Sequence, residues 1–149
     1  METQTIEQQY RTLKLIWFVL LFSQTMFLLV IFLAKPDIFQ PDFSKPVSGG
    51  ENSMFVAVFA ILAITNLTIS FVLEKRCISQ AIEKQDGQYV RLGLILGCAF
   101  CESISLLGMV LAFAFGYQYF FVWFALGITG IILHFPKRNN LVAANRKSL

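Results

Sequence analysis

Glu102 is the residue of this chain with the clearest chemistry, because it is the only carboxylate in the largely apolar or small-residue run 89–115. It comes eleven positions after Arg91. At the helical rise of ~1.5 Å per residue, it would lie ~16 Å inside a hydrocarbon layer ~30 Å thick. An ionised carboxylate at that depth costs at least ~2.5 kcal/mol, so it usually faces protein or water and often carries a proton. The sequence therefore predicts that Glu102 binds a proton or Na⁺.

Polar residues of other apolar runs are predicted at the depth of Glu102. Counted from the basic residue at the end of each run, Gln24 and Asn66 also lie ~12–17 Å deep. Ser105 follows Glu102 by three positions, on the same helix face. We expect these three side chains to form one ion-binding site with Glu102, because a buried carboxyl needs a hydrogen-bonding partner. The alternative is that amides and hydroxyls only hold helices together, at ~0.6–2 kcal/mol each.

A stripe of small residues repeats every four positions along the same run. It consists of Gly93, Gly97, Cys101 and Ser105. Small side chains let another helix approach closely. The stripe therefore predicts tight helix packing, either within one bundle or between the subunits of a homo-oligomer. We favour subunit contacts, because the neighbours of Glu102 form a second small face on the same helix.

The composition is that of an integral membrane protein. The 149 residues are 56% hydrophobic and 14% charged, with a mean hydropathy of +0.66, which is too apolar for an ordinary soluble domain. The basic residues form no stripe that would bind nucleic acid. No acid pair, nucleophile–base pair or metal-ligand cluster is recognisable, and the only histidine, His134, stands at a helix end. We therefore expect no enzyme, no metal and no cofactor other than a proton or Na⁺.

The apolar runs predict an all-α fold, in which residues 1–149 form one integral membrane domain, a four-helix up-down bundle. The connector 74–88 extends both neighbouring helices and is broken at Asp86-Gly87. The loop 35–52, with three prolines and a Gly-Gly pair, is extracytoplasmic and contains a short structured excursion. The tail 136–149 is cytoplasmic, and disordered from residue 139 on. The predicted transmembrane helices are ~12–34, ~53–73, ~89–115 and ~119–135.

Basic residues also predict the orientation, because they favour the cytoplasmic side of a membrane. Ten of the twelve Lys and Arg residues lie in the N-terminus, the region 74–91 or the C-terminus, and only Lys35 and Lys45 lie elsewhere. Both termini are therefore predicted to be cytoplasmic, in what we take to be a bacterial inner membrane. The run 15–34 is expected to stay as a helix, because it exceeds the about 7–15 residues of a signal-peptide core and no cleavage site follows it.

The sequences of residues 22–33 and 100–111 resemble one another and align without gaps, a similarity that we call the internal echo. The alignment places Gln24 on Glu102 and gives four identities in twelve positions. If the echo is more than chance, the chain is a tandem of two helix pairs in parallel orientation, in which an amide replaces one carboxylate.

The segment 96–113, LGCAFCESISLLGMVLAF, resembles the carboxylate-bearing helix of the rotor-ring c subunits (proteolipids) of rotary ATP synthases. That helix carries an ion-binding Glu or Asp in a pattern like ALxEALxIIGLVLAF. The resemblance implies a central hairpin like that of the c subunit, a homo-oligomer that can be a ring, and Glu102 as the ion-binding residue. The chain departs from the family in its second span, which has no glycine, and in its two further helices. The matching residues are Glu102, Leu106, Leu107, Gly108, Val110, Ala112 and Phe113.

Three functions follow as hypotheses. The first is a small proteolipid-like membrane protein that forms a homo-oligomer and binds a proton or Na⁺ at Glu102. The second is a non-transporting accessory subunit that docks on other membrane subunits of a larger complex through its aromatic-rich first helix. The third is a small proton-coupled exporter, which we rank last because such carriers usually hold their carboxylate in the first helix.

Overall fold

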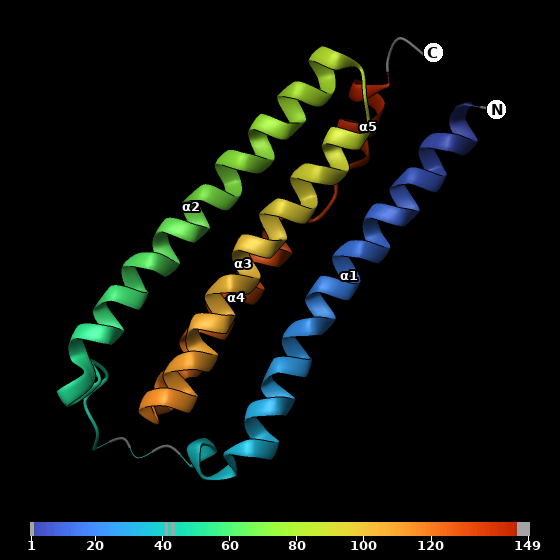
Figure 1. The fold of residues 1–149 in the computed structure, drawn as a ribbon. Coiled ribbons are helices and arrows are strands. Elements are labelled where there is room, and N and C mark those ends of the chain that lie inside the picture. Colours follow the sequence, from blue (N-terminus) through green and yellow to red (C-terminus); the bar gives the residue numbers. More distant parts are fainter. Residues whose placement is uncertain (1, 41, 43, 146–149) are drawn as a thin grey trace.

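The computed structural model describes residues 2–40, 42 and 44–145. Over these residues the chain is helical and contains no strand, which confirms the predicted all-α class. Figure 1 shows the helices. In chain order the elements are α1 (Glu2–Ala34), η1 (Pro36–Phe39), η2 (Gly50–Asn52), α2 (Ser53–Lys84), α3 (Gln88–Phe115), η3 (Gln118–Phe120), α4 (Phe121–Leu133) and α5 (Arg138–Ala144).

The long helices end at residues that interrupt a helix. α1 ends before Lys35-Pro36, where the proline ring prevents another turn. α2 ends where Gln85 takes a left-handed conformation with a φ of 54°. α3 ends before Gly116, which has a φ of 58° and suits glycine because it carries no Cβ. α2 and α3 therefore extend through the polar connector and meet at Asp86-Gly87, as the sequence predicts.

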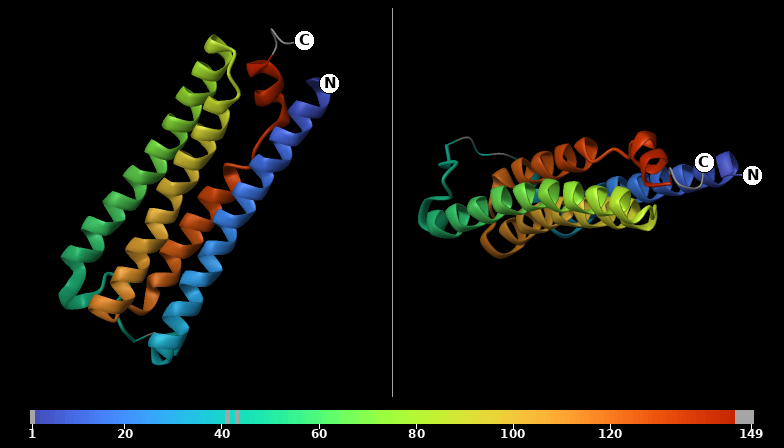
Figure 2. Two further views of the ribbon diagram at one scale, coloured as in Figure 1. Left: turned by 45° about the vertical axis from the view of Figure 1, so that its right-hand side comes forward. Right: turned by 90° about the horizontal axis from the view of Figure 1, so that it is seen from above.

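α3 lies at the centre of the molecule. α1 and α2 flank it on opposite sides and α4 packs behind it, so that α3 contacts all three (Figures 1 and 2). α1 and α3 run in one direction, and α2 and α4 run in the other. Both termini and the α2–α3 connector therefore lie at one end of the molecule, the terminal end. The segment 35–52 lies at the opposite end, the loop end.

Three helices, α1, α2 and α3, are long and apolar enough to cross a membrane. α1 and α2 exceed the predicted spans because no Pro or Gly interrupts their polar turns at the terminal end. α4 has 13 residues and covers only ~20 Å at ~1.5 Å per residue. Together with η3 and α5 it passes the same test as one broken span bent by 49°. The predicted helix 119–135 is therefore corrected to a shorter one, because residues 118–120 form a 3₁₀ turn and α4 ends at Leu133.

The segment 35–52 is held against the turn between α3 and α4. The Tyr117 hydroxyl donates to the carbonyl oxygen of Val47 at 2.6 Å. Gln118 donates to the carbonyl oxygen of Asp42 at 2.6 Å and accepts from the Asp42 N–H at 3.0 Å. Burial raises the pKa of the Tyr117 phenol, which keeps its proton as the donor. With η1 and η2 this segment contains the short structured excursion that the sequence predicts.

The predicted disorder from residue 139 on is wrong for the part of the tail that the structure describes. Residues 138–144 form α5, in which Leu141 and Ala144 are buried. They pack in one apolar cluster with Ile6 of α1 and Val90 of α3. Apolar side chains on one face of a short helix therefore outweigh the polar composition of the tail. Residues 146–149 lie outside the described residues.

Candidate functional site

Glu102 lies half-buried on α3 and meets Ser23 of α1. The Ser23 hydroxyl is in hydrogen-bonding contact with Glu102 Oε1. Ser23 Oγ also lies 2.7 Å from the carbonyl oxygen of Leu20, and a carbonyl oxygen can only accept a hydrogen bond. When the Ser23 hydrogen points at Leu20, its oxygen can accept the proton of a neutral Glu102. The geometry therefore accommodates the protonated acid.

The other predicted ligands of this site do not converge on Glu102. Asn66 of α2 donates to Ser103 Oγ at 2.8 Å instead. Gln24 is 1% exposed, and neither atom of its amide has a hydrogen-bond partner among the described residues. Ser105 Oγ is likewise buried without a partner in this part of the chain. The predicted ligands and their partners thus form two separate pairs, Glu102–Ser23 and Asn66–Ser103, and two groups without a partner among the described residues.

The small-residue stripe of α3 is covered by helices of the same chain. A Cβ added to Gly93 would lie 2.8 Å from Cys77 Cβ on α2. A Cβ added to Gly97 would lie 2.4 Å from Cδ2 of His134. Cys101 is fully buried. These contacts account for the small side chains within one bundle, so the stripe gives no support to the preference for subunit contacts.

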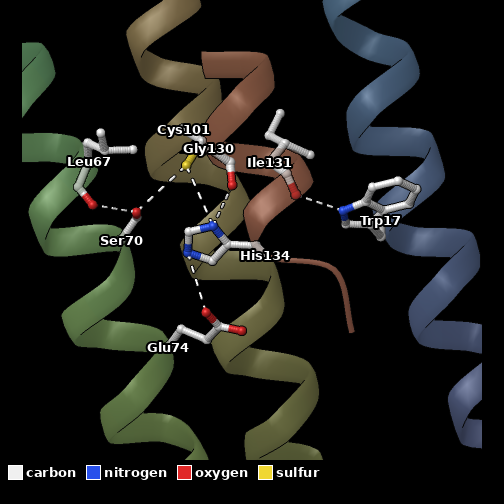
Figure 3. Close-up of polar contacts among 8 residues, drawn as sticks. All are labelled: Trp17, Leu67, Ser70, Glu74, Cys101, Gly130, Ile131 and His134. Atoms are coloured by element: carbon white, nitrogen blue, oxygen red, sulfur yellow. Dashed lines mark hydrogen bonds and ion pairs between the residues drawn. The ribbon is translucent and has the colours of Figure 1, made fainter. Parts of the chain in front are cut away.

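A second polar cluster, centred on His134, was missed by reasoning from the sequence. His134 follows the last residue of α4 and has an exposed fraction of 0%. Its Nδ1 lies 2.7 Å from the carbonyl oxygen of Gly130, and its Nε2 lies 3.5 Å from Oε2 of Glu74 (Figure 3). Because Glu74 belongs to α2, the pair joins α2 to the end of α4 through a buried ring.

Residues of α2 and α3 fix the orientation of the His134 ring. Phe71 stacks on it, with ring centroids 4.5 Å apart. Gly97 leaves room for its edge, and Cys101 Sγ lies 3.9 Å from Nδ1. Cys101 Sγ is in turn 3.6 Å from Ser70 Oγ. The ring is therefore enclosed by three helices, with an acceptor oxygen facing each of its nitrogens.

Trp17 attaches α1 to the same end of α4. Its indole N–H donates to the carbonyl oxygen of Ile131 at 2.7 Å (Figure 3). The indole also packs edge-on against Phe135, with centroids 5.1 Å apart. The Ile131 carbonyl, in the last turn of α4, also accepts from the His134 backbone N–H at 3.2 Å, so Trp17 gives it a second donor. α1, α2 and α3 therefore all contact the end of α4.

The basic pairs that predict the orientation also contain a sequence signal for the His134 cluster. Glu74 stands directly before Lys75-Arg76, and His134 stands shortly before Lys137-Arg138. Both basic pairs mark the predicted cytoplasmic ends of their runs. Glu74 and His134 therefore share one depth on α2 and at the end of α4, two helices that run in the same direction, which is the condition for contact.

Comparison with protein-family models, with curated proteins and with solved structures finds no match to this chain. The resemblance of residues 96–113 to c subunits therefore rests on the sequence pattern alone. Within the described residues, no three His, Cys, Asp or Glu side chains come together as ligands for a metal ion. The candidate sites are accordingly the Glu102–Ser23 contact and the Glu74–His134 pair.

Proposed function

We propose that this chain is an integral membrane protein that binds a proton at Glu102, near the middle of its helical bundle. The observation that carries the proposal is the contact of Glu102 Oε1 with Ser23 Oγ, beside the carbonyl oxygen of Leu20. In this arrangement the hydroxyl can donate to the carbonyl and accept from the acid at the same time. The neutral carboxyl of Glu102 therefore has a hydrogen-bond acceptor in the Ser23 hydroxyl.

Charge supports the same protonation state. The ion pairs of the described residues are Glu74–His134 and Glu7–Arg138, so neither includes Glu102. A carboxylate without a cation in a layer of low polarity is destabilised by several kcal/mol, at least ~2.5 by insertion scales. Binding a proton removes that cost.

Embedding in a membrane is supported by the outer surface of the bundle. Large apolar side chains are exposed on every long helix, among them Leu33 (72%), Met54 (76%) and Leu133 (61%). Soluble monomers rarely expose contiguous apolar patches of such extent, whereas hydrocarbon tails cover them without cost. The exposed side chains also include Phe18 and Phe22 of α1.

A proton fits the Glu102 site better than Na⁺. Hard cations take several oxygen ligands, and the oxygen that contacts the Glu102 carboxyl among the described residues is Ser23 Oγ. Gln24 and Asn66, which we predicted as further ligands, are placed elsewhere. A proton needs only one acceptor, and Ser23 supplies it.

The proposal includes assembly as a homo-oligomer, by the resemblance of residues 96–113 to proteolipids. Because α2 and α4 cover the small-residue stripe, the subunits would meet through another face. The second candidate is an accessory subunit of a larger membrane complex. It is favoured by the outer face of α1, which exposes Phe18 by 62% and Phe22 by 53%.

Labelling with a hydrophobic carbodiimide tests the Glu102 proposal, because this reagent modifies protonated carboxyls that lipid can reach. We expect Glu102 to be labelled in intact membranes, with labelling that declines as pH rises and is lost in Glu102→Gln. Glu51→Gln, which removes an exposed carboxyl at the loop end, should leave labelling unchanged. No labelling of Glu102 at mildly acidic pH would contradict the proposal.

The mass of the assembly in mild detergent separates the two candidate functions. A defined multiple of the chain mass supports the homo-oligomer. Co-purification of other chains with a single copy supports the accessory subunit. Competition of labelling by Na⁺ would show that the site takes this cation as well as a proton.

A further inference from the structure

The fully buried His134 imidazole has a carbonyl oxygen at hydrogen-bonding distance from Nδ1 and a carboxylate oxygen at ion-pair distance from Nε2. The carbonyl oxygen of Gly130 lies 2.7 Å from Nδ1, and a carbonyl oxygen accepts but cannot donate. Glu74 Oε2 lies 3.5 Å from Nε2. A neutral imidazole has only one N–H, so only one of its two nitrogens could donate toward these oxygens. The Gly130 carbonyl also accepts from the His134 backbone N–H at 3.2 Å, whereas the Glu74 carboxylate faces Nε2. The doubly protonated imidazolium carries an N–H toward each oxygen, in a hydrogen bond at Nδ1 and in the ion pair with Glu74 at Nε2.

The charged and titratable groups around the ring favour the same state. On α2, Glu74 is the only partner with a full charge, and its side chain is 22% exposed. Lys137, in the link from α4 to α5, acts on Glu74 with a positive charge. α3 contributes the thiol of Cys101, whose Sγ lies 3.9 Å from Nδ1, and the nearby thiol of Cys98. α1 contributes Trp17, which carries no charge. The carboxylate that faces the ring is therefore that of Glu74.

We propose that Glu74 and His134 form a proton-binding site of their own, near the terminal end of the bundle. His134 holds the proton as an imidazolium, and Glu74 is the carboxylate that stabilises it. Glu74 is the partly exposed member, so the proton is exchanged with water at the terminal end through its carboxyl. No heavy-atom bond forms or breaks, and one proton passes between solvent and Nε2.

This site is separate from the one at Glu102. Glu102 meets Ser23 of α1, whereas His134 meets α2, α3 and the end of α4. The inference therefore does not depend on the proposed function of Glu102. Its location also differs, because Glu74 and His134 stand next to the basic pairs at the helix ends.

The single histidine of the chain makes the test direct. Protein labelled with ¹⁵N-histidine gives the signals of one imidazole, and these distinguish the imidazolium from the two neutral tautomers. We expect imidazolium signals at neutral pH for the wild-type protein in lipid nanodiscs. In Glu74→Gln we expect loss of the Nε2 proton and a neutral ring protonated at Nδ1.

Two control variants make the comparison specific. Glu83→Gln removes the same charge from an exposed position on α2 and should keep the imidazolium. Glu102→Gln should also keep it, whatever that variant does to carbodiimide labelling. Circular dichroism shows whether each variant retains its helix content.

Three results would overturn the inference. The first is a neutral ring in the wild-type protein at neutral pH, which needs no variant to interpret. The second is an imidazolium that persists in a folded Glu74→Gln protein, since the carboxylate would then not hold the proton. The third is loss of the imidazolium in Glu102→Gln, which would make the two sites one coupled system.

Discussion

Replacing Gly97 by alanine should displace the His134 ring, because the two groups occupy neighbouring space. A Cβ at position 97 would lie 2.4 Å from Cδ2 and 2.8 Å from Nε2 of His134. Ordinary van der Waals contact of a Cβ begins at 3.4 Å, so the ring must shift by about 1 Å. The shift moves Nε2 from its place beside Glu74 and disturbs the stacking on Phe71.

The size of the effect follows from two opposing terms. Overpacking a filled interior costs about 1–3 kcal/mol, and alanine in place of a helical glycine returns up to about 1 kcal/mol of helix propensity. Weakening the Glu74–His134 pair adds to the cost, because a charged partner is left without its counterpart. We therefore expect Gly97→Ala to destabilise the folded protein by about 1–3 kcal/mol.

A double-mutant cycle with His134→Ala measures whether the ring is the cause. Helix content during unfolding in mild detergent gives the stability of each variant. Gly97→Ala should cost much less when residue 134 is alanine, because the clashing ring is gone. Ala99→Gly, at an exposed position of α3, gives the propensity baseline. An equal cost of Gly97→Ala in both backgrounds would refute the reasoning.

Two further predictions concern the contacts that attach α1. Trp17→Phe removes the hydrogen bond to the Ile131 carbonyl and should destabilise the fold by about 1 kcal/mol, as measured by the same unfolding assay. Lys35→Met removes the ammonium that donates to the Phe113 carbonyl at 2.8 Å and should speed proteolysis near the loop end, whereas Lys45→Met should not. Unchanged stability in the first case, or equal proteolysis of the two lysine variants in the second, would show that these contacts are dispensable.

The long elements could be predicted because each depends on local sequence. Apolar runs of sufficient length, a proline at 36 and a Gly at 116 are enough to locate three helices and their ends. The start of the fourth helix was harder to predict from the sequence. Aromatic residues 119–121 are as apolar as a helix interior, but η3 forms there because Tyr117, Gln118 and Tyr119 bond to the segment 35–52. These contacts join residues 70 to 76 positions apart and have no local signal.

The sequence places Glu102 level with residues 23 and 24 of α1, but it did not indicate which of them faces Glu102. Counting residues along a helix gives the level of Glu102, and Ser23 does lie opposite it. The prediction named Gln24, the next residue. One residue turns a helix by ~100°, so neighbours at one level face different helices. The rotation of α1 about its axis depends on its packing against α3 and α4, and the sequence of α1 exposes too many apolar faces to specify it.

The relation of α1 to α3 bears on the internal echo of the sequence. The two helices run in the same direction (Figure 1). Their contacts join Ser23 to Glu102 and Lys35 to Phe113, which are 79 and 78 positions apart. The echo aligns residues 22–33 with 100–111 at a separation of 78 positions. Residues that correspond in the echo therefore lie at nearly the same height on neighbouring parallel helices.

This register is compatible with a tandem of two helix pairs in parallel orientation, and the similar lengths of α1 and α2 also produce it. In such a tandem, Gln24 and Glu102 occupy equivalent positions that have different surroundings. Gln24 is enclosed with its amide unpartnered, whereas Glu102 is half-exposed and has Ser23 as its partner. A carboxyl at the enclosed position would have neither a hydrogen-bonding partner nor access to solvent or lipid. The half-exposed position is therefore the one of the two at which a proton can be held and exchanged.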